Sequence, residues 1–201
     1  MTRPWRTALL WLGALLATTG AQAFDLQQLD RQLSQPAVVR GDFVQEKHLR
    51  ALAQPLVSRG HFVLARDSGL LWRLRSPLEQ DYRISDVGVA RRDGDQWRNG
   101  EQARTTAQFN RLFLAALRGD SSVLAKDFEL QLSGSPERWE LAMTPRSALL
   151  KQVFTHILIS GGATPTRLEL YETQGDSTLV QLQNTEIDQQ LRADERHDFA
   201  H

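Results

Sequence analysis

Residues Gly60–Pro77 read G-H-F-V-L-A-R-D-S-G-L-L-W-R-L-R-S-P, and this pattern predicts a β-hairpin. Side chains alternate between the two faces of a strand, so residues two positions apart share a face. Asp67-Ser68-Gly69 supplies the turn because glycine tolerates positive φ, and Pro77 ends the second strand because it cannot donate to the ladder. One face of the hairpin is therefore apolar, and we expect it to face the core.

That apolar face carries a charged side chain, Arg66, at its edge. Its apolar members are Phe62, Leu64, Leu70, Trp72 and Leu74. A guanidinium next to apolar side chains needs oxygen acceptors, because burying it unpaired is costly. An ordinary surface arginine at a strand end is the alternative interpretation.

Short alternating segments flank the hairpin on both sides. Turn residues separate them at close intervals, which is typical of an antiparallel meander. The expected strands include Val38–His48, Gln80–Ile84, Val89–Arg92, Val153–Ser160 and Leu179–Asn184. We expect about ten or eleven strands in one sheet, and a sheet of that length must curl.

Helical patterns occur at the start and in the middle of this series. Phe24–Gln35 has an amphipathic stripe that includes Leu33. Thr105 and Gln108 form a capping box before a second stripe. That stripe consists of Phe109, Leu112, Phe113, Ala116 and Leu117. The predicted fold is therefore mainly β (α+β): an incomplete antiparallel half-barrel with a helical lid.

The first 23 residues have the features of a secretory signal peptide. Arg3 and Arg6 precede a short apolar run, and Ala21-Gln22-Ala23 fits a cleavage site after Ala23. An uncleaved membrane anchor is the alternative. We expect the domain to occupy residues 24–187, followed by a polar, frayed tail over residues 188–201.

Composition excludes several classes of protein. The 201 residues include no cysteine, so the chain has no disulfide and no site for a lipid anchor on cysteine. Basic and acidic residues number 24 each, with no basic block, which argues against a nucleic-acid partner. An exported protein of the periplasm is the expectation.

Motifs across the chain resemble the periplasmic outer-membrane lipoprotein carrier family, LolA. Phe43-Val44-Gln45 resembles the F-x-Q strand of that family, and Gly60–Arg66 resembles its G-x-(apolar)-x-V-x-R strand. Ser85–Gly88 resembles its S-D-G turn, and Leu141–Arg146 resembles its L-x-P-K region. Trp72 and Pro77 stand at the family's spacing downstream of Arg66, and Gly175-Asp176, followed by Leu179 and Gln181, resembles its late hairpin. The resemblance covers about Leu26 to Asn184.

Three departures indicate a divergent branch. Asp67 follows Arg66 where the family has proline, and Arg146 replaces a lysine. The segment between Val87 and Thr105 is short, and Arg91–Asp95 stands where the family has an apolar strand.

The resemblance implies a carrier that binds the acyl chains of lipoproteins in an apolar cavity and ferries them from the inner to the outer membrane. An inner-membrane transporter would be the donor and an outer-membrane protein the acceptor, with the carrier itself a monomer. Arg66 matches a lid latch that holds the empty cavity closed. The expected cavity residues are Leu33, Phe43, Phe62, Leu64, Leu70, Trp72, Leu74, Phe109, Phe113 and Leu117.

Two other functions remain open within this fold. One is a carrier of a free lipid, a glycolipid or another hydrophobic product. The other is an interaction protein whose barrel is filled by its own side chains. A hydrolase or other envelope enzyme is a third, more distant possibility.

Catalytic and metal motifs are poorly supported. The sequence has no G-x-S-x-G elbow and no P-loop, and no cofactor is expected. His197 and His201 are four residues apart near carboxylates, but a solvated tail is the favoured interpretation. The pairs Arg73/Arg75 and Arg91/Arg92 fit either a basic patch or a solvated outer face.

Overall fold

The computed structural model describes residues 24–100 and 104–200, except the side chains of residues 104–109. The helices are α1 (Leu26–Ser34), α2 (Arg104–Arg118), α3 (Ser121–Leu124), α4 (Ala148–Lys151) and α5 (Ala193–Ala200). The strands are β1 (Val38–His48), β2 (Leu56–Ala65), β3 (Gly69–Ser76), β4 (Gln80–Ser85), β5 (Gly88–Asp93), β6 (Gln96–Asn99), β7 (Phe128–Ser135), β8 (Arg138–Pro145), β9 (Phe154–Gly161), β10 (Pro165–Glu172) and β11 (Ser177–Asp188). The expected signal peptide lies outside the described residues.

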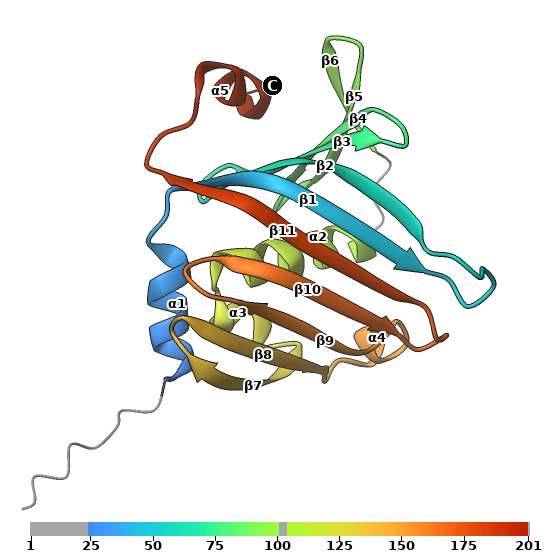
Figure 1. The fold of residues 1–201 in the computed structure, drawn as a ribbon, viewed down its shortest axis with the longest axis vertical. Coiled ribbons are helices and arrows are strands. Elements are labelled where there is room, and N and C mark those ends of the chain that lie inside the picture. Colours follow the sequence, from blue (N-terminus) through green and yellow to red (C-terminus); the bar gives the residue numbers. More distant parts are fainter. Residues whose placement is uncertain (1–23, 101–103, 201) are drawn as a thin grey trace, which may run out of the picture.

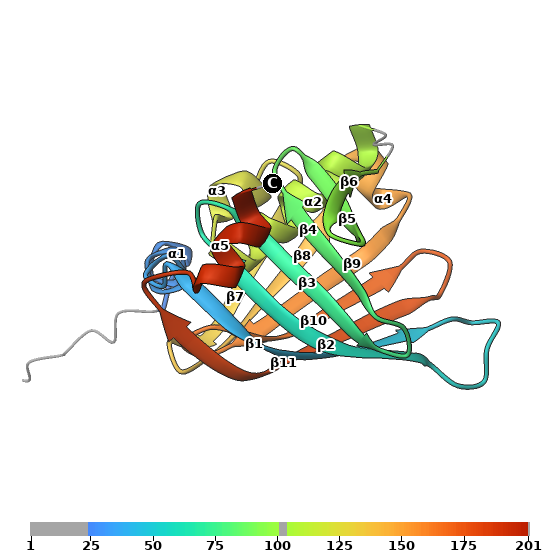
Figure 2. The same cartoon turned by 90° about the horizontal axis from the view of Figure 1, so that it is seen from above.

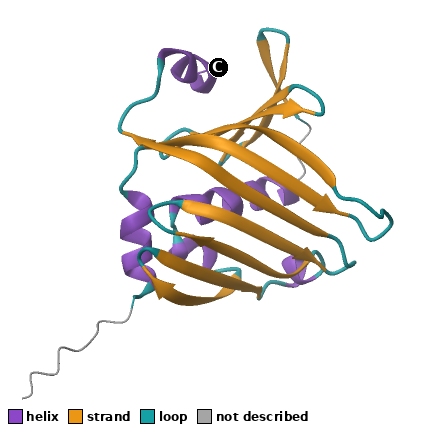
Figure 3. Ribbon diagram, viewed as in Figure 1, coloured by secondary structure: helices purple, strands orange, loops and turns teal. Residues whose placement is uncertain are grey.

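Within the described residues, eleven strands form one sheet in the order β6-β5-β4-β3-β2-β1-β11-β10-β9-β8-β7. Each strand pairs antiparallel with its neighbour, and β11 joins the two halves by pairing with β1. The sheet curls into an open half-barrel, with α1, α2 and α3 on its concave side (Figures 1 and 3). The predicted fold class is confirmed.

The β2–β3 hairpin has the predicted register. Phe62 pairs with Trp72, and Leu64 pairs with Leu70. Gly60 lies opposite Phe43 on β1, and a side chain at Gly60 would collide with the backbone carbonyl of Arg73 and with the Phe43 ring. The missing side chain lets Phe43 stack on Trp72, with the ring centroids 3.7 Å apart. The core of this half of the sheet is therefore densely filled.

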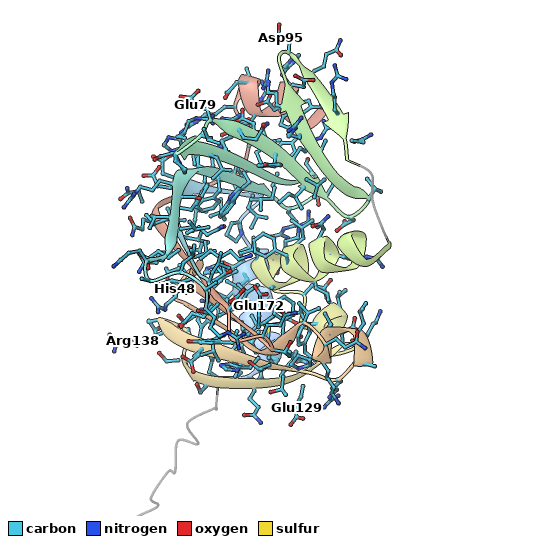
Figure 4. The ribbon with its side chains drawn as sticks, turned by 90° about the vertical axis from the view of Figure 1, so that its right-hand side faces the viewer. His48, Glu79, Asp95, Glu129, Arg138 and Glu172 are labelled. Carbon is cyan, nitrogen blue, oxygen red and sulfur yellow. The ribbon has the colours of Figure 1, made fainter. Side chains whose placement is uncertain are left out.

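Helix α2 spans the opening of the curled sheet. Figure 4 looks into the open side and shows α2 between the two halves. The helix begins at Arg104, one residue before the expected cap Thr105. It ends at Arg118 and is followed by Gly119, which has φ +70. Leu114 and Leu117 are buried in the concave core. Helix α2 is thus positioned as the predicted lid.

The C-terminal segment differs from the expected frayed tail. Strand β11 extends to Asp188, and α5 packs on the convex side of β3 (Figure 2). Leu191 and Phe199 cover the apolar residues Val63 and Leu71 on that side. The helix was missed because its sequence, A-D-E-R-H-D-F-A, has almost no apolar periodicity. The short helix α4, between β8 and β9, was also missed, because four residues are too few to show a period.

Candidate functional site

An apolar cavity of about 210 Å³ lies between α2, α4 and strands β8 to β10. The residues that line it are Asn110, Leu112, Phe113, Ala116, Phe128, Met143, Leu150, Phe154, Ile157, Ile159, Leu168 and Leu170. All of them except Asn110 are apolar. The chemistry of this wall suits a hydrocarbon ligand.

The cavity wall follows from strand alternation in β9 and β10. Ile159 pairs with Leu168, and Ile157 pairs with Leu170, so four apolar side chains project from one face. Between them, Leu158 projects from the opposite face. This half of the sheet contributes aliphatic side chains where the other half contributes the Phe43–Trp72 stack. Space therefore remains here once α2 has packed.

Asn110 is the polar exception in the cavity wall. Its side-chain Nδ2 is buried and has no hydrogen-bond partner. A buried donor without an acceptor costs about 1–3 kcal/mol. Such a group calls for an explanation, and an oxygen atom of a bound ligand would satisfy it.

The predicted cavity residues lie mainly outside this space. Phe113 lines it. Phe43, Phe62, Leu64, Leu70, Trp72, Leu33 and Leu117 are buried in the concave core, and Leu74 packs against that core partly exposed. The side chain of Phe109 lies outside the described residues. The predicted residues other than Phe113 and Phe109 would meet a ligand only if α2 moved away from the sheet.

Sequence reasoning missed the wall formed by β8 to β10. The apolar alternation of Ile157, Ile159, Leu168 and Leu170 was visible in the sequence, as was that of Phe62, Leu64, Leu70 and Trp72. Both patterns predict that these side chains point toward the concave core. Which half leaves a space depends on how α2 packs, and periodicity does not contain that information.

Arg66 lies in the turn after β2, half-buried. Its Nη2 donates to the carbonyl oxygen of Pro36 at 3.1 Å, and its backbone N–H donates to Ala37 O at 3.0 Å. The side chain therefore binds the segment that follows α1. A role of Arg66 as the latch of the lid stays a prediction.

Among the side chains that the structure describes, polar contacts made by the helices of the concave side are few. Ser121 in α3 donates its hydroxyl to Asp30 of α1 at 2.6 Å. Arg118 at the end of α2 lies 3.5 Å from Asp86 in the β4–β5 turn. Most of the contact between α2 and the sheet is apolar. A lid held in this way can separate from the sheet without breaking buried ion pairs.

The convex side carries the buried charges. Arg40 on β1 binds both carboxylate oxygens of Glu195 at 2.9 Å and also binds Asp188 at 3.0 Å. Asp198 accepts from Arg73 at 2.8 Å and from Arg92 at 2.7 Å. The exposed fractions of Arg40, Glu195 and Asp198 are 5%, 2% and 5%.

These ion pairs decide the role of one arginine in each basic pair, whereas Arg75 pairs with Asp81 and Arg91 is exposed. Arg73 and Arg92 form neither a free basic patch nor a solvated face, because each binds the buried carboxylate of Asp198. Burial alone would raise the pKa of Glu195, but hydrogen bonds from Arg40 and from the backbone N–H of Arg192 lower it. The carboxylate form of Glu195 is therefore the form that the fold stabilises.

Metal ligands do not gather in the described part of the chain, where no group of three or more His, Asp or Glu side chains could hold an ion. His201, one of the two histidines considered for a metal, lies outside that part. None of the described helices is long and apolar enough to cross a membrane.

Solved structures provide distant likenesses. A LolA superfamily protein from Nitrosomonas europaea has 9% identity and a TM-score of 0.47, with 86% of this chain and 97% of the other covered. LprF from Mycobacterium bovis has 8% identity and a TM-score of 0.40, with 83% and 94% covered. A putative outer membrane lipoprotein-sorting protein domain from Vibrio parahaemolyticus has 8% identity and a TM-score of 0.36, with 86% and 95% covered. Similarities at this level carry no argument about function.

The sequence comparisons are more decisive. Among curated proteins, none matches this chain. The family model described as "Outer membrane lipoprotein carrier protein LolA-like" matches residues 18–189, which is most of the sequence. Together with the curled sheet and its helical lid, this match shows that the chain belongs to the LolA-like family of outer membrane lipoprotein carrier proteins.

Proposed function

We propose that the protein is a periplasmic carrier that holds the acyl chains of a lipid-linked cargo and ferries it from the inner to the outer membrane. The observation that carries this proposal is the apolar cavity of about 210 Å³ beneath α2. Its walls offer hydrocarbon contacts and one unpaired amide donor, Asn110. No covalent chemistry is required.

The size of the cavity implies a lid that opens. Sites that enclose a ligand usually measure about 300–1,000 Å³, so this cavity holds only part of a lipid in the state described. The apolar contact between α2 and the sheet can be exchanged for contact with acyl chains. The packed residues on the other half of the concave face, including Leu64 and Trp72, would then join the site.

The hydrophobic free energy is sufficient for carriage. Burying a methylene contributes roughly 0.8 kcal/mol, so a single long chain contributes on the order of 10 kcal/mol. Opening the lid exposes apolar surface and offsets part of this gain. Loading would then require an inner-membrane transporter as donor, and release would require an outer-membrane acceptor.

A carrier of a free lipid or glycolipid is the second candidate. The small cavity favours it, because a triacylated anchor needs room for three chains and a single lipid needs less. Both candidates use the same site. They differ in the cargo that the purified protein would contain.

Native mass spectrometry of the mature protein, purified from periplasm without detergent, tests the proposal. We expect a bound lipoprotein or a bound lipid, which organic extraction then identifies. Ile157→Trp fills the cavity and should abolish the bound species, whereas Leu158→Trp, on the opposite face of β9, should leave it. An empty wild-type protein that also takes up no hydrophobic fluorescent probe would contradict carriage.

A further inference from the structure

A second pocket, of about 770 Å³, lies beside the C-terminal half of α2. It is bounded by α1, by α3 and by the β2–β3 and β4–β5 turns, and α1 and α3 lie next to each other in Figures 1 and 2. Four arginines line it: Arg31, Arg66, Arg111 and Arg118. They come from three separate parts of the chain, so the fold gathers positive charge at one place.

The three aspartates that line this pocket do not neutralise it fully. Asp30 accepts hydrogen bonds from the backbone N–H and the hydroxyl of Ser121. Asp120 accepts from Ser122 Oγ at 2.7 Å and from the backbone N–H of Val123 at 3.1 Å. Only Asp86, which is exposed, pairs with an arginine, at 3.5 Å from Arg118.

The arginines retain donors without acceptors. Nε of Arg118 is buried and has no hydrogen-bond partner. The guanidinium of Arg66 donates one hydrogen bond, from Nη2 to the carbonyl oxygen of Pro36. Arg31 and Arg111 are exposed, and their side chains form no ion pair within the described residues. A buried guanidinium nitrogen in a positively charged hollow is best satisfied by an anion.

We propose that this pocket binds the phosphate of a phosphorylated lipid head group. This inference rests on the proposed carrier function, because it specifies the class of cargo. Guanidinium groups match the oxygens of phosphate with paired donors, and several around one hollow can surround a single phosphate. The pocket volume lies within the range of about 300–1,000 Å³ that encloses a small molecule.

The two pockets lie on different faces of α2, which connects them. Ala115 and Arg118 face the arginine pocket, whereas Phe113 and Ala116 face the apolar cavity. The two buried donors without partners, on Asn110 and Arg118, are eight residues apart, or about 12 Å along the helix axis. When α2 moves away from the sheet, as the proposed carrier function requires, one lipid can place its phosphate beside Arg118 and its chains beneath α2.

Calorimetric titration of the mature protein tests the proposal with three probes: dihexanoyl phosphatidic acid, dihexanoyl glycerol and inorganic phosphate. We expect phosphatidic acid to bind roughly tenfold or more tightly than the neutral lipid, since charge-assisted hydrogen bonds carry this preference. The preference should shrink at higher ionic strength, because two of the arginines are exposed.

The double variant Arg31→Gln/Arg111→Gln should lose that preference and keep the affinity for dihexanoyl glycerol. The matched control is Arg138→Gln/Arg146→Gln, which removes two exposed arginines that do not line the pocket; Figure 4 shows Arg138 well away from α2. The control should bind all three probes as the wild type does.

Each remaining outcome overturns part of the account. Equal affinity of the wild type for both lipids would overturn the phosphate site and leave the carrier function standing. If the double variant lost affinity only for inorganic phosphate, the pocket would be a site for the free anion. That result would overturn the assignment to a lipid head group. Failure of both lipids to bind would contradict the carrier function itself.

Discussion

Two helices cover opposite faces of the same sheet, and they are attached by different forces. Helix α2 lies on the concave face through apolar contacts, above a cavity and with a buried unpaired donor at Asn110. Helix α5 lies on the convex face through the buried ion pairs of Glu195 and Asp198, in addition to the apolar contact of Phe199. The contrast indicates a concave helix that can be displaced by a ligand and a convex helix that is fastened to the sheet.

Breaking the convex attachment should have the largest effect. Arg40→Met leaves Glu195 buried without its cation, and we expect a loss of about 3–5 kcal/mol in the free energy of unfolding by urea. The control is Arg192→Met, which removes an exposed pair with Glu186 and should cost less than about 1 kcal/mol. Equal losses in the two variants would mean that the buried pair does not fasten α5.

Arg66→Leu tests the latch on the concave side. Removing a charged hydrogen bond to Pro36 O should destabilise the closed state by about 1.5–3 kcal/mol. We expect cargo to load and then to transfer more slowly to an acceptor membrane. Normal transfer by this variant would remove the latch role from Arg66.

Asn110→Leu removes the unpaired donor in the cavity. Because the closed state no longer buries an unsatisfied group, the free energy of unfolding should rise by about 1–3 kcal/mol. The variant should also bind ester-linked lipids more weakly than the wild type if Asn110 donates to the cargo. Asn99→Leu, at an exposed position on β6, serves as the control and should change neither quantity. Destabilisation by Asn110→Leu would indicate that the amide is satisfied in solution.

Lowering the pH should weaken the convex attachment of α5 before it affects the concave core, and this is the smallest of the expected effects. Hydrogen bonds from Arg40 lower the folded-state pKa values of Glu195 and Asp188. The two carboxylates therefore stabilise the fold fully above the ordinary carboxyl pKa, and this contribution is lost as the pH falls through the folded-state pKa. We expect α5 to loosen before the concave core does. Fluorine NMR of the protein labelled with fluorotryptophan reports both faces, because Trp97 packs near α5 and Trp72 lies in the concave core. Simultaneous changes at both residues would contradict the difference in attachment.

Sequence patterns predicted the concave face better than the convex one. The hairpin from Gly60 to Pro77 has a strong alternating pattern and a glycine turn, and its register is the expected one. Local rules of this kind also located β1 and the amphipathic stripe of α2. These elements are determined by neighbours in the sequence.

The convex helix and the cavity depend on distant partners. Glu195 meets Arg40 across 155 positions of the chain, and neither residue carries a local signal of burial. The cavity exists because α2 lies against β4 and β5 in one half of the sheet and leaves a space beside Ile157 and Ile159 in the other half. Alternation gives the inward face of each strand, but the space left between faces is a property of three-dimensional packing.

Isoleucine methyl NMR tests the cavity most directly. The sequence contains four isoleucines: Ile157 and Ile159 line the cavity, Ile84 lies in the other half of the concave core, and Ile187 is exposed. On titration with a single-chain lysolipid, we expect nuclear Overhauser contacts from the acyl methylenes to Ile157 and Ile159 and none to Ile187. Contacts confined to Ile187, or binding that leaves Ile157 and Ile159 unchanged, would contradict the assignment of the cargo site beneath α2.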